Sequence, residues 1–572
     1  MVGNAAGGLP YARFDRVASW AERLLAFAER SHANAAVLLL VLSLACFLPG
    51  FASLQPMDRD EPRFSQATKQ MLETRDFVDI RFQDEARYKK PIGIHWMQAA
   101  SVELAEALGV RDARTTIAAY RVPSLIGALA AVLLAYWAAL AFAGRREAFL
   151  AAALIGASVI LSVEARLAKT DAVLLACSVT AMGALARAWL SRGLGRQPLS
   201  LCLIFWAAIA LGILIKGPMV IMFTGLAAVV LSVRERSWRW LGELRPGLGL
   251  AIILLAVVPW FAAIAWKSGG EFYRLAVGDD MLGKVTTGQQ KHGAPPGFYL
   301  VSSFATFWPG AAMAALAAPF CWRERRDDAV AFLLAWTVPA WLVFEAVPTK
   351  LPHYVMPLYP AIAILVVLAL SRGAIRPDRL RARIVYGLMP FVPVGLTVGL
   401  LAGAWLLDRD VPAAGLPVLL AAGALSIASW LCFARGEVIR AALLGLPASA
   451  ALSIAVFGFV QPVLQSLKLS PRLVDAMGAA PCSDPRIVTL GYREPSLVFL
   501  AGTDLAMASG GPDAAAFLGG PGCRIALVDS RLEPAFLGAA GPDAPTLLRR
   551  VGGFNINGGR RTDIGVYARV PR

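Results

Sequence analysis

The segment MDRDEPRF holds three carboxylates, Asp58, Asp60 and Glu61, directly after the first long apolar block of the chain. A carboxylate held at the edge of a membrane can take a proton from an attacking hydroxyl group, which is general-base chemistry. A plainer role is also open, because Asp60 is a good helix N-cap and Pro62 suits the first turn of the helix that would follow. The two roles are compatible.

Basic and aromatic residues follow in RFQDEARYKKPIGIHW, where Arg87, Tyr88, Lys89 and Lys90 precede an amphipathic run from 92 to 108. Such a cluster can bind a phosphate group through charge-assisted hydrogen bonds. Attraction to lipid headgroups would select the same residue types. The cluster therefore indicates an anion without saying whether it is a substrate or the membrane.

Three later segments, EARLAKTD, IKGP and TKLPHYVMPLYP, also place charged or polar residues at the ends of apolar blocks. These residues are Glu164, Arg166, Lys169, Asp171, Lys216, Lys350, His353 and Tyr354. Taken singly, each could be a snorkelling side chain or a helix cap. Taken together, they would gather acids and cations on one face of a membrane protein, and charge at that depth is a functional hypothesis by default.

Several kinds of chemistry lack their sequence signals. The chain has no G-x-x-x-x-G-K-S/T loop, no dinucleotide fingerprint after a strand, no H-E-x-x-H and no G-x-S-x-G. Its four histidines, His32, His95, His292 and His353, give no metal-binding pattern. We therefore predict no metal site and no certain cofactor; a divalent cation is possible but nothing indicates one.

The elements that must position these residues are membrane helices. Hydrophobic residues make up 57% of the 572 residues and charged residues only 16%, which is too apolar for an ordinary soluble fold. The apolar blocks have the length of a bilayer crossing. About thirteen spans are predicted, near 34–53, 117–143, 147–163, 171–190, 199–215, 218–233, 247–266, 297–320, 329–347, 353–371, 384–407, 412–433 and 441–460.

Arginine placement predicts the orientation of these spans. Arginines gather before the first span and in alternate loops, for example at 145–146, 234–245 and 372–383, and such loops prefer the cytoplasmic side. The N-terminus is then cytoplasmic, and an odd number of spans puts the tail outside. The formal charge of +16 reflects this topology better than it reflects binding to nucleic acid, because the basic residues are scattered.

Two domains are expected. Residues 1–460 would form the membrane domain, with a long outer loop at 54–116, and residues 461–572 a small extracytoplasmic α/β domain. The runs PRIVTLGY, SLVFLAG, CRIALVD and DIGVYARV have strand length, while GFNINGGRRTD could be no more than a turn. Cys482 and Cys523 could pair if the tail is in an oxidising compartment, and the sequence leaves that open.

At these motifs the chain resembles the GT-C membrane glycosyltransferases, and most closely the bacterial lipid A aminoarabinose transferases, which are related to the protein O-mannosyltransferases. The matching motifs are D-E-x-R-[YF] from Asp60 to Phe64, R-Y-x-K-P from Arg87 to Pro91, A-R-x-x-x-T-D ending at Asp171, K-G-P at Lys216, K-L-P-x-Y from Lys350 to Tyr354, and GYREPSLVF in the tail. Their order and their positions at span ends make the set fairly specific.

The resemblance implies an inverting transfer of a sugar from a polyprenyl-phosphate donor to a hydroxyl or phosphate of an envelope acceptor, lipid A or lipopolysaccharide above all. It implies Asp60 as the catalytic base and Asp171 as a second acid. The residues it assigns to the donor phosphate are Arg63, Tyr88, Lys90, Lys216, Lys350 and Tyr354. It also implies a bacterial inner membrane protein with its outer domain in the periplasm.

One position departs from the family pattern, since Lys89 stands where the aminoarabinose transferases usually have glutamate before the Lys-Pro pair. A family-like metal contact is therefore not indicated there, and both the sugar and the acceptor stay open. The alternative function is a polytopic transporter or a flippase for lipid-linked sugars. The sequence shows neither an internal repeat nor a matched pair of broken helices of the kind typical of transporters.

Overall fold

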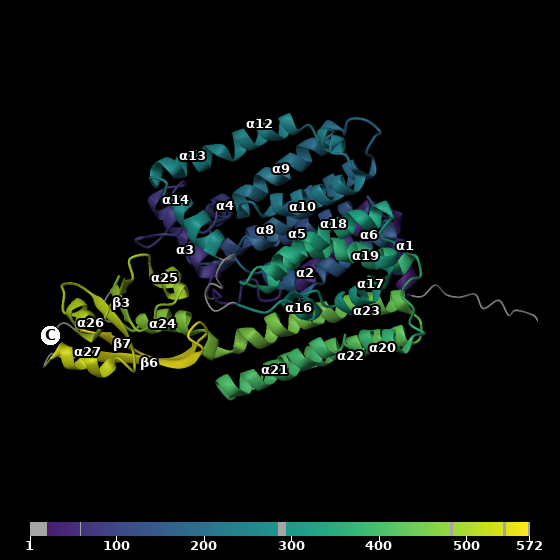
Figure 1. Cartoon of the computed structure of the whole chain (residues 1–572). Coiled ribbons are helices and arrows are strands. Elements are labelled where there is room, and N and C mark those ends of the chain that lie inside the picture. The colour runs from purple at the N-terminus through teal and green to yellow at the C-terminus, as the bar shows by residue number, and fades with distance from the viewer. Residues whose placement is uncertain (1–19, 58, 284–292, 481–483, 542–544, 570–572) are drawn as a thin grey trace, which may run out of the picture.

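The computed structural model describes residues 20–57, 59–283, 293–480, 484–541 and 545–569. Figure 1 shows a large bundle of helices with a small sheet domain at one end, built from the C-terminal part of the chain. Asp58, His292 and Cys482, which figured in the sequence analysis, lie outside the described residues. The predicted combination of a helical membrane protein and a C-terminal α/β domain is confirmed.

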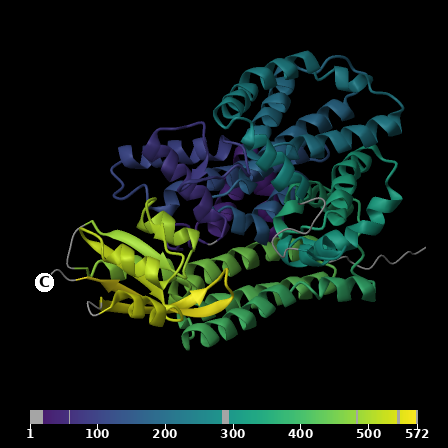
Figure 2. The same ribbon diagram turned by 60° about the vertical axis from the view of Figure 1, so that its left-hand side comes forward.

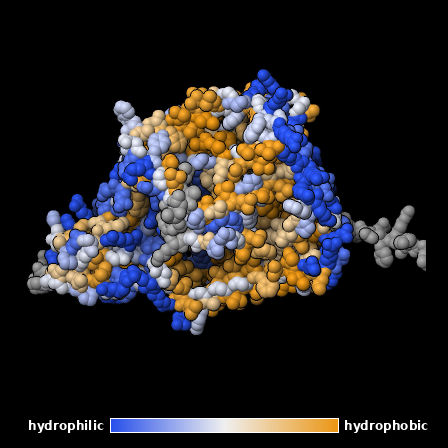
Figure 3. Space-filling model, in the orientation of Figure 1, coloured by the Kyte–Doolittle hydropathy of each residue, from blue (hydrophilic) through white to orange (hydrophobic). Residues whose placement is uncertain are grey.

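Nine helical stretches in the described residues are long and apolar enough to cross a membrane. They consist of α5 (Ile117–Ala139), α8 (Asp171–Leu190), α9 (Leu199–Lys216), α12 and α13 (Pro246–Ala256, Val258–Lys267), α18 (Asp328–Ala346), η3 and α19 (Pro352–Leu358, Tyr359–Ser371), α20 and α21 (Leu380–Tyr386, Phe391–Asp408), η4 and α22 (Ala413–Gly415, Leu416–Ala434), and α23, η5 and η6 (Val438–Ser453, Ile454–Val460, Gln461–Val463). Figure 3 shows the matching surface, with hydrophobic side chains over the middle of the bundle and hydrophilic ones at its two ends.

The other four predicted spans are shorter or interrupted, so the count of thirteen stays a prediction. Their helices are α2 (His32–Phe47), α6 and α7 (Arg145–Gly156, Val159–Glu164), α10 (Met219–Glu235), and α16 and α17 (Phe298–Thr306, Ala311–Arg323). Between α6 and α7 the backbone becomes extended at Ser158, and the amide of Val159 bonds to the carbonyl of Trp308 instead of to its own helix. The break between α6 and α7 therefore lies beside the break between α16 and α17, and a backbone hydrogen bond joins the two.

Short helices complete the bundle. They are α1 (Trp20–Arg30), α11 (Arg239–Gly242), α14 (Glu271–Tyr273), η1 (Arg274–Leu282) and η7 (Gln465–Leu467). Helix α1 is amphipathic and packs its buried side against α2 and α6. Helix α1 itself lies at the end of the bundle opposite the sheet domain (Figure 1).

The long loop after the first apolar block folds into two helices joined by a small hairpin. The elements are α3 (Glu61–Thr74), β1 (Arg81–Phe82), β2 (Glu85–Ala86) and α4 (Gly93–Ala107). Helix α3 starts where Pro62 favours a first turn, and α4 covers the predicted amphipathic run. Helix α4 packs against α5 and α9, so the loop lies on the ends of the membrane helices.

The C-terminal domain is a five-stranded sheet with helices on both faces. Its elements are α24 (Leu469–Met477), β3 (Arg486–Leu490), α25 (Pro495–Ala501), β4 (Ala506–Met507), α26 (Gly511–Leu518), β5 (Arg524–Asp529), α27 (Glu533–Ala540), β6 (Thr546–Asn555) and β7 (Arg560–Ala568). The strand order is β4-β3-β5-β7-β6; β3 runs parallel to β4 and β5, and β7 runs antiparallel to β5 and β6.

Two details of this domain differ from the sequence expectations. The run SLVFLAG is helical, as α25, and not a strand; Pro495 occupies its first turn and residues 495–499 are all buried, a pattern that periodicity alone cannot separate from a buried strand. The segment GFNINGGRRTD is more than a turn, because it also contains paired residues of β6 and β7, from Gly553↔Thr562 to Asn555↔Arg560. Cys523 is disulfide-bonded.

The C-terminal domain docks on α3 through polar contacts. The ammonium of Lys69 donates to the carbonyl of Phe499 at 3.0 Å, and the Gln66 amide donates to the Thr503 hydroxyl at 2.8 Å. Gln83, next to β1, donates to the carbonyls of Thr503 and Leu505. Figure 2 shows the purple outer loop beside the yellow-green domain. The helix that begins at Asp60 is therefore held from the membrane side and from the outer side.

Candidate active site

The two adjacent acids at the start of α3 have opposite environments. The carbonyl of Asp60 accepts the first hydrogen bonds of the helix, from the amides of Arg63 and Phe64. The Asp60 carboxylate makes no capping hydrogen bond and is exposed. Its position is thus that of an N-cap, but its side chain does not perform the capping and remains open to a substrate.

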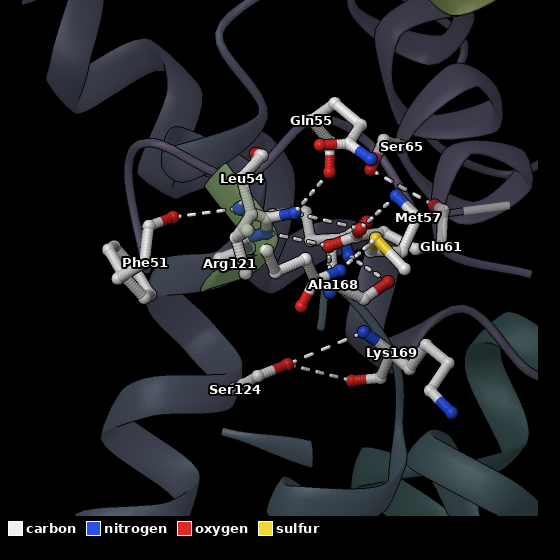
Figure 4. A network of polar contacts seen from close by, with 12 residues as sticks. Phe51, Leu54, Gln55, Met57, Glu61, Ser65, Arg121, Ser124, Ala168 and Lys169 are labelled. Carbon is white, nitrogen blue, oxygen red and sulfur yellow. Dashed lines mark hydrogen bonds and ion pairs between the residues drawn. The ribbon is translucent and has the colours of Figure 1, made fainter. Parts of the chain in front are cut away.

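Glu61 is 1% exposed and pairs with Arg121 of α5, which is 0% exposed. Arg121 Nε lies 2.7 Å from Glu61 Oε1, and Arg121 Nη2 lies 2.9 Å from Oε2. The guanidinium also donates to the carbonyls of Phe51, Leu54 and Gln55 at 2.8–3.0 Å. Figure 4 shows these groups converging on the guanidinium. All five N–H groups of the arginine are therefore directed at partners that fix the segment before α3.

The same carboxylate also fixes a second loop. Glu61 Oε1 accepts from the amide of Ala168 at 2.9 Å, and Oε2 accepts from the amide of Met57 at 2.7 Å. Ser124, on α5, donates to the carbonyl of Lys169 at 3.1 Å (Figure 4). The loop between α7 and α8 is consequently held against the start of α3, which brings Lys169 close to Asp60.

A mixed cluster of charges lies at the ends of α7, α8, α9 and η3. Lys169 Nζ is 3.1 Å from Glu164 and 3.8 Å from Asp171, and Lys216 forms an ion pair with Asp171. The His353 ring nitrogens lie 3.6 Å from Glu164 and 3.7 Å from Asp171. Two acids and two lysines therefore nearly neutralise one another, with the histidine between the acids.

Tyr354 joins this cluster at its edge. The ammonium of Lys216 lies 5.7 Å from the centre of the Tyr354 ring, which is cation–π distance. The Tyr354 ring also packs edge-on against His353, with ring centres 5.1 Å apart. Its partly exposed phenol can donate a hydrogen bond toward the same space.

Several cations that have no carboxylate partner among the described residues also lie close to Asp60. Arg63, Arg87 and Lys89 have no carboxylate within ion-pair distance among the residues that the structure describes. Arg87 lies over the Phe64 ring at 5.2 Å. Lys90 is 2.9 Å from Asp280 of η1. This edge carries an excess of positive charge, which suits a phosphate group.

These cations set the electrostatics of Asp60. Partial burial raises the pKa of Asp60, but the charges of Lys169, Arg87 and Arg63 lower it by more, so the pKa lies below its ordinary value. Burial, together with the nearby charge of Arg63, lowers the pKa of Arg87 to about 10. Two guanidinium groups that repel each other would be stabilised by a bound anion.

Asp60 also borders a cavity of about 240 Å³. We call it the Asp60 cavity; its lining residues are Leu54, Met57, Arg59, Asp60, Glu61, Val163, Arg166, Leu167, Lys169, Phe457 and Gln461. Arg63, Arg87 and Lys90 are not part of this lining. The Asp60 carboxylate therefore borders the cavity and also lies close to the charges of the basic edge.

Most of the predicted site residues come together, and two are engaged elsewhere. Asp60 lies close both to the basic edge, which carries Arg63 and Lys90, and to the charge cluster, which carries Asp171, Lys216 and Tyr354. Tyr88 is buried in an apolar cluster and donates to Asp79 at 2.6 Å. Lys350 is buried and donates to the carbonyls of Glu345 and Val347 at the end of α18.

Sequence reasoning missed Arg121 and Asp280. Arg121 was visible as an arginine inside an apolar span, a signal of buried pairing or function. Asp280 lies in a segment without any motif, so nothing pointed to its contact with Lys90. In the described residues no group of three or more His, Cys, Asp or Glu side chains is arranged to hold a metal ion.

Comparison with known proteins finds similarity to sugar transferases that use lipid-linked donors. Residues 89–262 match the family model described as dolichyl-phosphate-mannose-protein mannosyltransferase. The chain is 26% identical over 349 residues to undecaprenyl phosphate-alpha-4-amino-4-deoxy-L-arabinose arabinosyl transferase 2 of Pseudomonas fluorescens strain Pf0-1, covering 60% of each chain. It is 27% identical over 309 residues to the corresponding transferase of Pseudomonas aeruginosa strain PAO1, covering 54% of each. The chain thus matches little more than half the length of these relatives.

The fold likeness extends further than the sequence likeness. The crystal structure of ArnT from Cupriavidus metallidurans bound to undecaprenyl phosphate superposes with a TM-score of 0.71 at 18% identity, covering 94% of this chain and 98% of that one. At that identity the superposition establishes the fold. The chain is therefore a multi-pass membrane protein with the GT-C fold, and it resembles the undecaprenyl-phosphate aminoarabinose transferases.

Proposed function

We propose that this protein is a membrane glycosyltransferase that moves a sugar from a polyprenyl-phosphate donor to a hydroxyl or phosphate of an envelope acceptor, with lipid A or lipopolysaccharide as the favoured acceptor. The observation that carries the proposal is the free carboxylate of Asp60 between a basic edge and a cavity. Two substrates could then approach the base from its two sides. The two sequence relatives named above are arabinosyl transferases by name, which supports transfer over transport.

In this mechanism the acceptor oxygen attacks the anomeric carbon of the donor from the face opposite the phosphate. A bond forms between that oxygen and the carbon, the bond from the carbon to the phosphate oxygen breaks, and the configuration inverts. The proton of the acceptor passes to Asp60, which acts as general base. The electron pair of the broken bond stays on the phosphate oxygen.

The basic edge would stabilise the leaving phosphate. Arg63 and Arg87 carry charge without a carboxylate partner among the described residues, and Lys90 adjoins them. Lys216 and Tyr354 would complete the site from the membrane side. Such fixed donors act where negative charge grows in the transition state. Asp171 would orient Lys169 and Lys216, and Tyr88 and Lys350 would hold the surrounding segments in place.

We further propose that the site faces the periplasm of a bacterial inner membrane, with the N-terminus in the cytoplasm. The alternating arginine-rich loops support this orientation. The disulfide at Cys523 also supports it, because disulfides persist in oxidising compartments. The C-terminal domain lies at the same end of the bundle as α3 and α4 (Figure 1), so both would be outside.

A transfer assay tests the proposal. Purified protein in detergent is incubated with extracted lipid-linked sugars and envelope lipids, and the labelled product is measured for the wild type and for Asp60→Asn. Loss of a positioned general base should lower the rate about 10²- to 10⁴-fold. Asp84→Asn, an exposed acid in the same loop, is the matched control and should keep the rate. Donor movement between leaflets without any transferred sugar would refute the proposal.

A further inference from the structure

The Asp60 cavity contains a buried cation that the protein satisfies only in part. Arg166 is 2% exposed, and its guanidinium lies 3.8 Å from the centre of the Phe457 ring. Its Nη2 donates to the carbonyl of Cys46 at 2.5 Å and its Nη1 approaches the Ser162 hydroxyl at 3.3 Å. Its Nε has no hydrogen-bond partner. No carboxylate in the described part of the chain lies within ion-pair distance of it.

This arrangement is unusual because a buried charge without a counter-ion is costly. Arg121 is similarly buried, but its charge is balanced by the Glu61 carboxylate. Glu61 borders the same cavity as Arg166, yet both of its oxygens are already engaged. An anion supplied by a ligand would provide the missing counter-charge.

A second cation borders the same space. Arg59 lies in the cavity lining and has no ion pair with the described residues. Arg59 comes from the segment before α3 and Arg166 from the segment after α7, so the two approach from different elements. Two separate guanidinium groups can contact different oxygens of one tetrahedral anion, which suits phosphate better than the two oxygens of a carboxylate.

The position of the base decides which substrate uses the cavity. A general base must come within about 3 Å of the proton that it removes, and Asp60 borders the cavity. Since the basic edge is assigned to the donor phosphate, the attacking oxygen of the acceptor would approach Asp60 from the cavity. The volume of about 240 Å³ is below the roughly 300–1,000 Å³ of pockets for drug-sized ligands, so it suits a compact head group rather than a lipid chain.

We infer that the Asp60 cavity is the acceptor subsite and that Arg166 and Arg59 bind a phosphate group of the acceptor there. The inference rests on the proposed function and adds a second anion site, separate from the basic edge of Arg63, Arg87 and Lys90. The base then lies between two phosphates, one on each substrate. The acceptor class is an envelope lipid or glycan whose phosphate adjoins, or itself contains, the attacking oxygen.

The test fills the two sites one after the other in the purified full-length protein. Undecaprenyl phosphate is added first and the shift in melting temperature is recorded; Arg63→Gln should weaken this response. Inorganic phosphate is then titrated at constant ionic strength with undecaprenyl phosphate kept saturating. The wild type should show a further saturable shift. Arg166→Gln and Arg59→Gln should each raise the apparent Kd for phosphate about tenfold, as expected for loss of a hydrogen bond to a charged group.

Arg111→Gln, an exposed arginine of the same outer loop, is the matched control and should titrate like the wild type. The inference is overturned if phosphate gives no second saturable shift, or if both cavity variants titrate like the control. If Arg166→Gln does not fold, the comparison of Arg59→Gln with the control decides. A protein that does not respond to undecaprenyl phosphate would instead contradict the proposed function, so the two failures are distinguishable.

Discussion

The Glu61–Arg121 pair should contribute far more to the free energy of unfolding than any surface ion pair of this protein. Replacing Arg121 by Met leaves a carboxylate that is 1% exposed without its counter-ion and takes the donors away from three backbone carbonyls. Breaking a buried pair from one side typically costs about 3–5 kcal/mol. Because Asp60 and Lys169 are both held through this pair, the transfer rate should fall even in the fraction that remains folded.

A double-mutant cycle measures this effect. Glu61→Gln, Arg121→Met and the double variant are unfolded with denaturant in mixed detergent micelles, and the coupling free energy is expected to be about 2 kcal/mol or more. The control cycle uses Glu106 and Arg114, whose 2.6 Å pair is partly exposed and should couple by less than about 1 kcal/mol. Equal coupling in the two cycles would refute the claim that burial makes the Glu61–Arg121 pair dominant.

Two further predictions concern the base and the basic edge. Lys169, Arg87 and Arg63 hold the pKa of Asp60 below its ordinary value of about 3.9, so the carboxylate stays ionised at any pH well above that value. A pH profile of kcat/KM should therefore show no acidic limb from Asp60 between pH 5 and 8. A limb in that range that disappears in Asp60→Asn would contradict this. Lys90→Ala removes the partner of Asp280 at the basic edge. This variant should raise the KM for the lipid-linked donor about tenfold, which is the effect of losing one charged hydrogen bond. An unchanged KM with a lowered kcat would place Lys90 away from the donor phosphate, and Arg111→Ala is the control.

Apolar length was enough to predict the nine long apolar helices of the described residues and the long loop that carries α3 and α4, whereas the roles of the site residues stay predictions. Each of the nine long apolar helices lies at a predicted span, because bilayer thickness dictates a minimum apolar length. The interrupted spans could not be predicted in the same way. The break at Ser158 depends on the carbonyl of Trp308, which is 150 positions further along the chain.

The roles of individual site residues were harder to predict because they depend on distant partners. Asp60 and Glu61 are neighbouring carboxylates that the sequence alone does not distinguish. Arg121 approaches from α5 and pairs with Glu61, which is buried, while the Asp60 side chain makes no capping hydrogen bond. Tyr88 and Lys350 are good phosphate ligands by type, but Asp79 and the carbonyls at the end of α18 engage them instead. Motif spacing identifies such residues without saying which contact each one makes.

The docking of the C-terminal domain on α3 has a consequence for how the protein is made. Lys69 and Phe499, which meet at 3.0 Å, are separated by 430 positions, so the ribosome completes the outer loop long before its last partner exists. Domains generally fold in the order of their synthesis. Helix α3 therefore stays incompletely packed until the C-terminal domain has been synthesised and has folded. A nascent chain would accordingly remain inactive during insertion, and the tail would supply the last step of its maturation.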